Sequence, residues 1–110
     1  MISLRFQIHS FFLDYVVLLI INQGDEYGYS LTQKIIDLFD VSESSIYPVL
    51  RRLKKDNYLD TYDEPYQGRN RRYYSITTHG MKKLQSFNQE WTQFKQAIDT
   101  LNFNEKGTNT

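Results

Sequence analysis

The sequence predicts a mainly α-helical fold with one small β-hairpin. Apolar residues recur at helical spacing in successive stretches of the chain. Two runs rich in Tyr, Thr and Ile flank a loop that contains Pro and Gly, which is typical of a hairpin. The chain has 110 residues, of which 40% are hydrophobic, and this suits one domain with a small core. The expected order is helix, helix, helix, hairpin, helix.

The first expected helix covers roughly residues 4–22, and its most apolar part is residues 11–21, interrupted by Asp14. That part should be buried on all sides. It is shorter than the ~20 apolar residues that cross a bilayer. No small-residue cleavage site of a signal peptide follows it. With no cysteine in the chain, disulfides and thiolate metal sites are excluded, and we expect a cytoplasmic protein without a membrane partner.

The second expected helix has Ser30 as its N-cap, and Gln33 completes a capping box. Its apolar face consists of Leu31, Ile35, Leu38 and Phe39. A very short break at residues 40–41 separates it from the next helix. Two short helices joined by a tight turn form a helix-turn-helix, whose second helix enters the major groove of DNA.

The third expected helix begins after Ser42 and stops near Asn57. Its buried face consists of Ile46, Val49, Leu50 and Leu53. Its opposite face carries side chains that can bond base edges or phosphates. The DNA-binding residues expected on this helix are Ser44, Ser45, Tyr47, Pro48, Arg51, Arg52 and Lys55. A proline inside a helix costs a hydrogen bond, and such broken local rules tend to mark functional sites.

The hairpin is expected from strands at residues 58–63 and 71–77, joined by a loop at residues 64–70. Its basic tip would consist of Arg69, Asn70, Arg71 and Arg72. The net charge of the chain is zero, yet seven of its 13 Lys and Arg lie between Arg51 and Arg72. Beside a helix-turn-helix, such a hairpin is a wing that lies along the DNA backbone or minor groove. The alternative is an ordinary solvated turn.

The last expected helix begins at Thr77 or Thr78 and runs to about Leu101. Its apolar residues follow a heptad spacing, which predicts a dimer seam. The seam consists of Leu84, Phe87, Trp91, Phe94, Ile98 and Leu101, and the partner surface includes Phe11, Phe12 and Tyr15 of the first helix. The expected division is residues 1–78 for DNA binding, 79–101 for dimerisation and 102–110 as a flexible tail.

Three sequence stretches resemble the PadR family of transcriptional regulators. They are GYSL at residues 28–31, VSESSIYPVLRRL at residues 41–53, and RYYSIT at residues 72–77 followed by Gly80. They occur in the family's order and at its intervals, and the similarity covers about residues 13–101. One departure is Asn57, where the family usually has Gly, and both residues tolerate the left-handed conformation.

The resemblance implies a winged-helix homodimer held by its first and last helices, which represses genes and is relieved by a small aromatic or hydrophobic effector. It also implies that Ser44, Tyr47, Pro48 and Arg51 face the operator and that Arg69 to Arg72 form the wing. Trp91 would lie near the two-fold axis, where in some compact members of the family such a residue stacks on planar drugs. The interpretation we favour is that Trp91 packs in the dimer seam.

Enzyme chemistry has little support in the sequence. The two histidines, His9 and His79, belong to different expected helices and have no acidic or sulfur partners at ligand spacing. No phosphate loop, nucleophile elbow or paired-carboxylate motif is present. We therefore expect neither an enzyme nor a cofactor. Two other functions fit the fold. One is a protein-interaction module, which the basic third helix disfavours. The other is a plasmid or phage replication protein, which a long basic tail or an ATPase-partner motif would favour, and neither is seen in this sequence.

Overall fold

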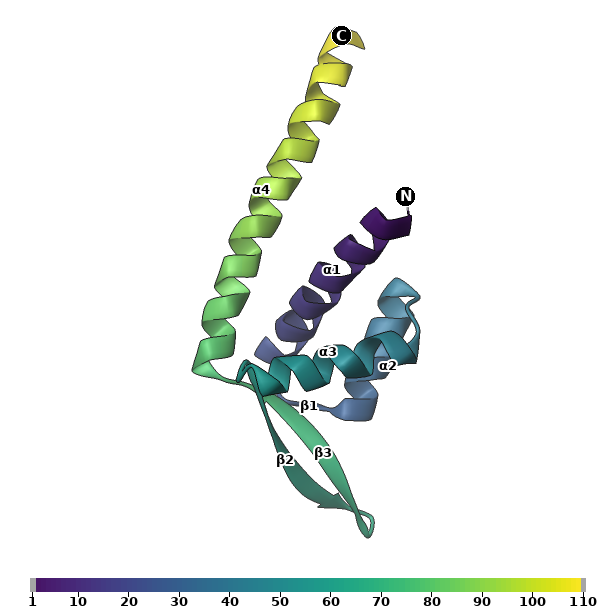
Figure 1. The fold of residues 1–110 in the computed structure, drawn as a ribbon, viewed down its shortest axis with the longest axis vertical. Coiled ribbons are helices and arrows are strands. Elements are labelled where there is room, and N and C mark those ends of the chain that lie inside the picture. The colour runs from purple at the N-terminus through teal and green to yellow at the C-terminus, as the bar shows by residue number, and fades with distance from the viewer. Residues whose placement is uncertain (1, 110) are drawn as a thin grey trace.

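The computed structural model describes the backbone of residues 2–109 and the side chains of residues 11–102. The elements within these residues follow the order α1 (Ile2–Asn22), β1 (Glu26–Tyr27), α2 (Gly28–Phe39), α3 (Glu43–Lys55), β2 (Leu59–Tyr66), β3 (Arg69–Ile76) and α4 (Thr78–Asn109). The β2–β3 hairpin projects from one end of a helical body, and the second half of α4 leaves the other end (Figure 1). The prediction of a mainly α-helical fold with a wing is confirmed.

Helix α1 lies at the centre of the core. It contacts α2, α3, β3 and α4. Its buried side chains are Leu13, Tyr15, Val16, Val17, Leu18 and Ile21. Burying one such aliphatic side chain is worth ~1.5–3 kcal/mol, so the elements that cover α1 are held to each other through it. The prediction of a buried helix is confirmed for this part of α1.

Helix α2 begins earlier than the sequence suggested. Glu26 and Tyr27 form a two-residue strand that pairs with Tyr74 and Tyr73 of β3, and the helix begins directly after it at Gly28. The Ser30 hydroxyl donates instead to the Tyr27 carbonyl, at 2.9 Å. The prediction of Ser30 as the N-cap was therefore wrong, because strand pairing places the extended residue before the helix at Tyr27.

The apolar face of α2 is buried at its start and exposed at its end. Leu31 and Ile35 are fully buried, whereas Leu38 is 68% exposed. Phe39 is partly exposed, and its ring meets Phe12 edge-on with 4.6 Å between centroids. The predicted burial of Leu38 and Phe39 was wrong, because the last turn of α2 lies one turn beyond the residues that meet the core.

Helix α3 has the predicted bounds and faces. Ser42 is its N-cap residue and Asn57, just after it, has the left-handed φ of 66°. The inner face of Ile46, Val49, Leu50 and Leu53 is buried. Between α2 and α3 the chain turns through Asp40, whose φ is 54°. This arrangement is the predicted helix-turn-helix.

The wing has longer strands and a tighter turn than predicted. Strands β2 and β3 pair in register from Leu59↔Ile76 to Tyr66↔Arg69. The turn is Gln67-Gly68, and both residues have positive φ, as in a type I′ turn. The predicted loop at residues 64–70 was wrong, so Arg69 to Arg72 lie in β3. With β1, the wing forms a three-stranded antiparallel sheet of order β1-β3-β2.

Helix α4 is capped at Thr77, whose hydroxyl accepts the N–H of Gly80 at 2.8 Å. It continues to Asn109 and not to Leu101. The end predicted near Leu101 was therefore wrong, and the backbone is helical over residues 102–109, where a flexible tail was expected. The last residue of that expected tail, Thr110, lies outside the described residues.

Gly80 allows α4 to approach the backbone of Tyr58, just before β2. A Cβ placed on Gly80 would lie 2.1 Å from the carbonyl oxygen of Tyr58, which is backbone and cannot rotate away. We predict that Gly80→Ala lowers the free energy of unfolding by about 1–3 kcal/mol or more, the cost of overpacking. Gly24→Ala is the control, because nothing lies within 4 Å of its added Cβ. Urea titration of both variants measures this, and an unchanged midpoint for Gly80→Ala would contradict the close approach.

Candidate nucleic-acid interface

The outer face of α3 is exposed and polar. Ser44, Tyr47, Pro48, Arg51 and Lys55 are exposed, while Ser45 is partly buried. Pro48 lies inside the helix as predicted. It has no N–H, so it cannot donate to the carbonyl of Ser44 four residues earlier. The face thus combines cations with hydroxyls, the groups that bond phosphates and base edges.

The hydroxyls at the start of α3 bond to each other. The Ser42 Oγ lies 3.1 Å from the Ser44 Oγ and 2.8 Å from the Ser45 Oγ. Tyr47 donates to the Glu43 carboxylate over a long 3.3 Å. Partial burial and that carboxylate raise the pKa of Tyr47.

Arg52 is engaged inside the chain. Its guanidinium makes two hydrogen bonds to the Asp14 carboxylate, of 2.7 and 2.8 Å. The bonds to Asp14 also raise the pKa of Arg52. This bidentate pair ties α3 to the central helix α1. Arg52, which the sequence assigned to phosphates, therefore has a partner, whereas Arg51 and Lys55 form no ion pair among the described residues.

Cations of α3 and of the wing act on the same tyrosine of the wing. Burial raises the pKa of Tyr74 in β3, and the charges of Arg72 and Arg51 oppose that rise. Arg72 belongs to the wing and Arg51 to α3, so one cation from each basic segment affects this hydroxyl.

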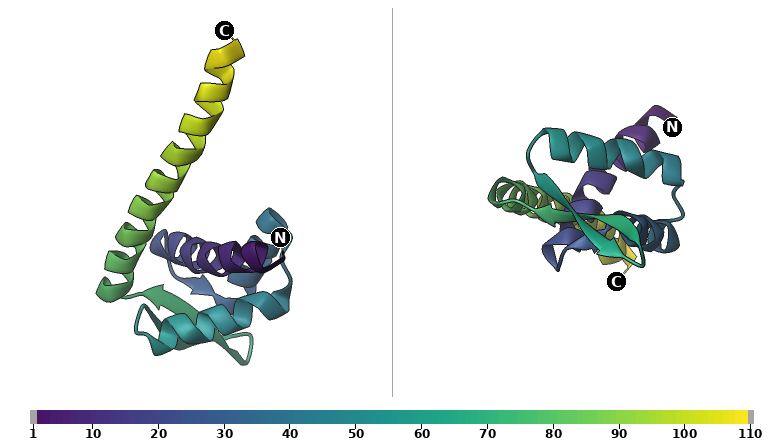
Figure 2. Two further views of the ribbon diagram at one scale, coloured as in Figure 1. Left: turned by 45° about the horizontal axis from the view of Figure 1, so that its top comes forward. Right: turned by 90° about the horizontal axis from the view of Figure 1, so that it is seen from below.

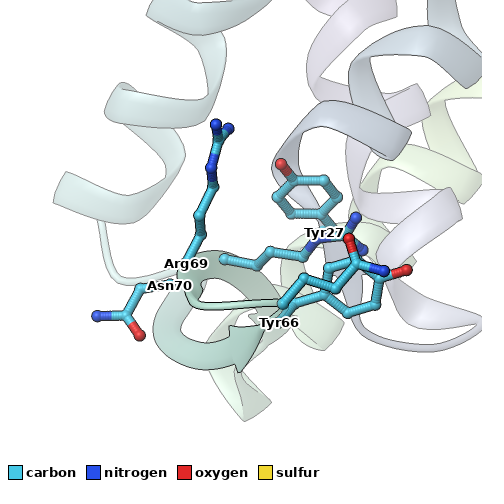
Figure 3. A pocket seen from close by; sticks show the side chains of 6 residues that line it. Tyr27, Tyr66, Arg69 and Asn70 are labelled. Carbon is cyan, nitrogen blue, oxygen red and sulfur yellow. The ribbon is translucent and has the colours of Figure 1, made fainter.

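The basic residues of the wing are not equivalent. Arg69, Asn70 and Arg72 are exposed, and Arg72 has a long 3.4 Å contact with Asp63. Arg71 is partly buried, with its guanidinium carbon 3.5 Å from the ring centroid of Tyr66 and 4.3 Å from that of Tyr27. Figure 3 shows Asn70 pointing away from these two rings and Arg69 extending to one side of Tyr27; these residues line one pocket together with Arg71.

A second contact joins the wing to the loop before β1. The Tyr62 hydroxyl donates to the Asp25 carboxylate at 2.7 Å. This bond, more than burial or other charges, raises the pKa of Tyr62 to about 12. The Tyr62 ring stacks on Tyr73, its cross-strand neighbour, with 5.5 Å between centroids.

The heptad stripe of α4 divides into two parts. Leu84 and Phe87, expected in the dimer seam, and Tyr15, expected on the partner surface, are instead buried in the core of their own chain, where Phe87 packs against Phe11 and Tyr15. The exposed part begins at Trp91, whose ring stacks on Phe94. It consists of Trp91 at 40%, Phe94 at 53%, Ile98 at 43% and Leu101 at 67% exposure.

The partners of Arg52 and Arg71 were not predicted from the sequence. Asp14 was visible as the one acid in an apolar run, and a lone carboxylate there indicates a cationic partner. Nothing in the sequence pointed to Tyr27 and Tyr66, because the contact of Tyr66 with Arg71 depends on the register of the hairpin and that of Tyr27 on how β1 meets the wing.

Membrane and metal sites have no support in the described part of the chain. None of its helices is long and apolar enough to cross a membrane. Within it, no group of three or more His, Cys, Asp or Glu side chains is placed to hold a metal ion.

Comparison with known proteins identifies the family. The model of the family described as "Transcriptional regulator PadR-like family" matches residues 17–86. A Streptococcus mutans structure has a TM-score of 0.77 and 39% identity, and covers 82% of this chain and 85% of its own. A PadR-like transcriptional regulator from Bacillus cereus has a TM-score of 0.78 and 34% identity, with coverage of 86% and 95%. The Bacillus subtilis PadR structure with operator DNA has a TM-score of 0.62 and 22% identity, with coverage of 68% and 45%.

The Arg52–Asp14 pair should stabilise the fold by a measurable but modest amount. Because the Arg52 side chain is 44% exposed, water screens the pair, and we predict a coupling of about 0.5–1 kcal/mol. Urea unfolding of Asp14→Asn, Arg52→Gln and the double variant gives this value as a double-mutant cycle. The coupling should shrink in high salt. Additive effects of the two substitutions would show that the pair does not hold α3 on α1.

Proposed function

Since the chain belongs to the PadR-like family of transcriptional regulators, we propose that it is a homodimeric repressor that binds a palindromic operator with α3 and the wing. The single observation that carries this proposal is the contrast between the two faces of α3. Its inner face is wholly buried, while its outer face presents Ser44, Tyr47, Arg51 and Lys55 beside a basic wing. A DNA complex of Bacillus subtilis PadR, which shares the fold, supports the same role here.

Base recognition falls to the exposed side chains of α3. Arg51 lies at the middle of the outer face and is unpaired among the described ion pairs. An arginine there matches the N7 and O6 acceptors of guanine. The hydroxyls of Ser44 and Tyr47 are exposed on the same helix. They can bond neighbouring bases or phosphates.

Phosphate contacts fall to Lys55 of α3 and to Arg69 and Arg72 of the wing, which are all exposed. Because the chain has no net charge, these local cations supply the attraction to the DNA backbone. Asn70, exposed in the same strand, adds an uncharged donor and acceptor. A protein of this kind works in the cytoplasm, with duplex DNA and a second copy of itself as partners.

Dimerisation falls to the exposed part of the α4 stripe. The exposed stripe consists of Trp91, Phe94, Ile98 and Leu101, and such a row is rarely left open on a soluble monomer. Phe11 and Phe12 of α1 are partly exposed and offer the partner an apolar surface. A two-fold axis through this region would relate the two α3 helices of the dimer. The two half-sites of a palindromic operator require this symmetry.

Relief of repression falls to the region of Trp91. Its ring is exposed and stacks on Phe94, so a planar aromatic effector has a surface on which to stack. Binding there acts on the dimer seam and, through α4, on the spacing of the two α3 helices.

Selection of bound sequences from random duplex DNA tests the proposed function. An enriched inverted repeat is the expected result, because two copies of α3 read two half-sites. Absence of any enriched sequence would contradict DNA recognition and favour a protein-interaction module. Enrichment of a single half-site would contradict dimeric recognition.

Substitution of Arg51 tests base reading. We predict that Arg51→Ala weakens operator binding by ~1–3 kcal/mol and relaxes the preference at one base pair in each half-site. Arg51 is exposed and outside the core, so the fold is retained. Fluorescence anisotropy with operator and random duplexes measures both effects. Equal weakening on the two duplexes would show that Arg51 contacts the backbone and not a base.

Charges in the exposed stripe test the dimer. We predict that Phe94→Asp with Ile98→Asp gives a folded monomer, because both side chains are exposed within the chain and two buried aspartates would oppose association. Gln89→Asp with Gln96→Asp places the same charges on another side of α4 and should leave a dimer. Sedimentation velocity compares them. A dimer for the stripe variant, or a monomeric wild type at micromolar concentration, would contradict the seam.

A further inference from the structure

We propose that Tyr27 and Tyr66 clamp Arg71, and that Arg71 is a positioning residue that holds the wing at a fixed angle to the helix-turn-helix. This inference rests on the proposed function, since it concerns how the wing is presented to DNA. It assigns Arg71 a role different from that of Arg69 and Arg72 in the same strand.

The geometry of the clamp is that of two cation–π contacts on one guanidinium. The central carbon of Arg71 lies 3.5 Å from the Tyr66 centroid and 4.3 Å from the Tyr27 centroid. Both distances are well within the ~6 Å over which a ring attracts a cation. The rings come from different elements, because Tyr66 ends β2 and Tyr27 precedes α2 as its N-cap residue. Arg71 therefore links the far end of the wing to the first helix of the helix-turn-helix.

The clamp begins where strand pairing ends. Strand β1 pairs with β3 at Tyr73 and Tyr74, and has no further residue to pair with Arg72 or Arg71. Beyond that point β2 is the only strand that pairs with β3 among the described residues. Without another contact the outer half of the hairpin would be free to swing. The Arg71 side chain extends the contact with Tyr27 past the last paired residues.

A row of aromatic contacts continues the clamp toward the base of the wing. The rings of Tyr27 and Tyr73 lie 5.9 Å apart, and Tyr73 stacks on Tyr62. Tyr62 in turn donates to Asp25, just before β1. Both ends of the row are thus fixed to the segment that joins α1 to α2, and Arg71 holds its outer end.

Arg71 also differs from its neighbours in exposure. It is partly buried, whereas Arg69 and Arg72 are exposed. It makes no ion pair with the cross-strand residue Glu64, although their Cα atoms are in register. The two rings are thus the contacts that hold its guanidinium. A wing held this way loses less freedom on binding, so its phosphate contacts cost less entropy.

Salt dependence distinguishes a positioning residue from a phosphate contact. We expect Arg71→Gln to weaken operator binding roughly five- to tenfold, the loss of two cation–π contacts, with an unchanged slope of log affinity against log salt. Arg69→Gln should make that slope shallower by ~1 per subunit. Equal slope changes for the two variants would show that Arg71 contacts phosphate and would overturn the proposal.

Ring variants test whether the tyrosines act through Arg71. Tyr66→Leu and Tyr27→Leu should each lose part of the affinity that Arg71→Gln loses, since each removes one of the two contacts. The double variant Tyr66→Leu with Arg71→Gln should bind no more weakly than Arg71→Gln alone. Tyr66→Phe and Tyr27→Phe keep the ring and should bind like the wild type. Tyr66 lies at the exposed end of the wing, so its variants stay folded even if those of Tyr27 do not. Additive losses would overturn the coupling.

Nuclear magnetic resonance of the free protein tests the clamp without DNA. The side-chain Hδ and Hε signals of Arg71 should be shifted upfield by the ring currents in the wild type and in Tyr66→Phe, and move toward ordinary values in Tyr66→Leu. Ordinary shifts in the wild type would overturn the clamp whatever the DNA results. Upfield shifts in a wild type that binds no duplex DNA would instead overturn the proposed function.

Discussion

The burial of α1 is the constraint on which the rest of the structure depends. From Leu13 to Ile21 this helix is apolar on nearly every side, so it needs cover from several directions at once. Helices α2 and α3, strand β3 and the first turns of α4 provide that cover. Each of them is placed by its contact with α1, and so are the parts that meet DNA.

This central packing links α3, which is proposed to read DNA, to α4, which is proposed to form the dimer. The inner face of α3 is held on the core by its four buried aliphatic residues, and Arg52 adds a bidentate bond to Asp14 of α1. On the other side of α1, Leu84 and Phe87 hold the start of α4. The second half of α4 extends beyond the rest of the chain in Figure 1 and in the left view of Figure 2. Movement of one α4 against another would therefore reach α3 through a single packed helix.

Periodicity in the sequence predicted most of the helices because core contacts repeat along them. The buried face of α3, the buried half of α1 and the start of α4 all follow from such spacing. It failed at the end of α2, where Leu38 has the right spacing but lies past the core. It also overestimated the seam of α4, since Leu84 and Phe87 are buried within their own chain.

Local rules failed where two distant segments decide the structure. Strand β1 has two residues and forms only because β3 is beside it, so no pattern in its own sequence predicts it. Composition suggested a long loop around Pro65, whereas pairing with β3 continues to Tyr66 and leaves a two-residue turn. In the same way, the basic residues were predicted as a group. Arg52 contacts Asp14, which is 38 positions away, and Arg71 contacts Tyr27, which is 44 positions away. These contacts could not be predicted from the spacing of residues along the chain.

One packed helix, α1, holds the two elements proposed to read DNA, and the proposed dimer presents two copies of them on one side of the duplex. Methylation interference at guanine N7 tests this arrangement, because the modified atom lies in the major groove, where α3 would bind. We predict two clusters of interfering guanines on the same face of the duplex, about one helical turn or ~34 Å apart. A single cluster, or interference confined to the minor-groove N3 of adenine, would contradict it.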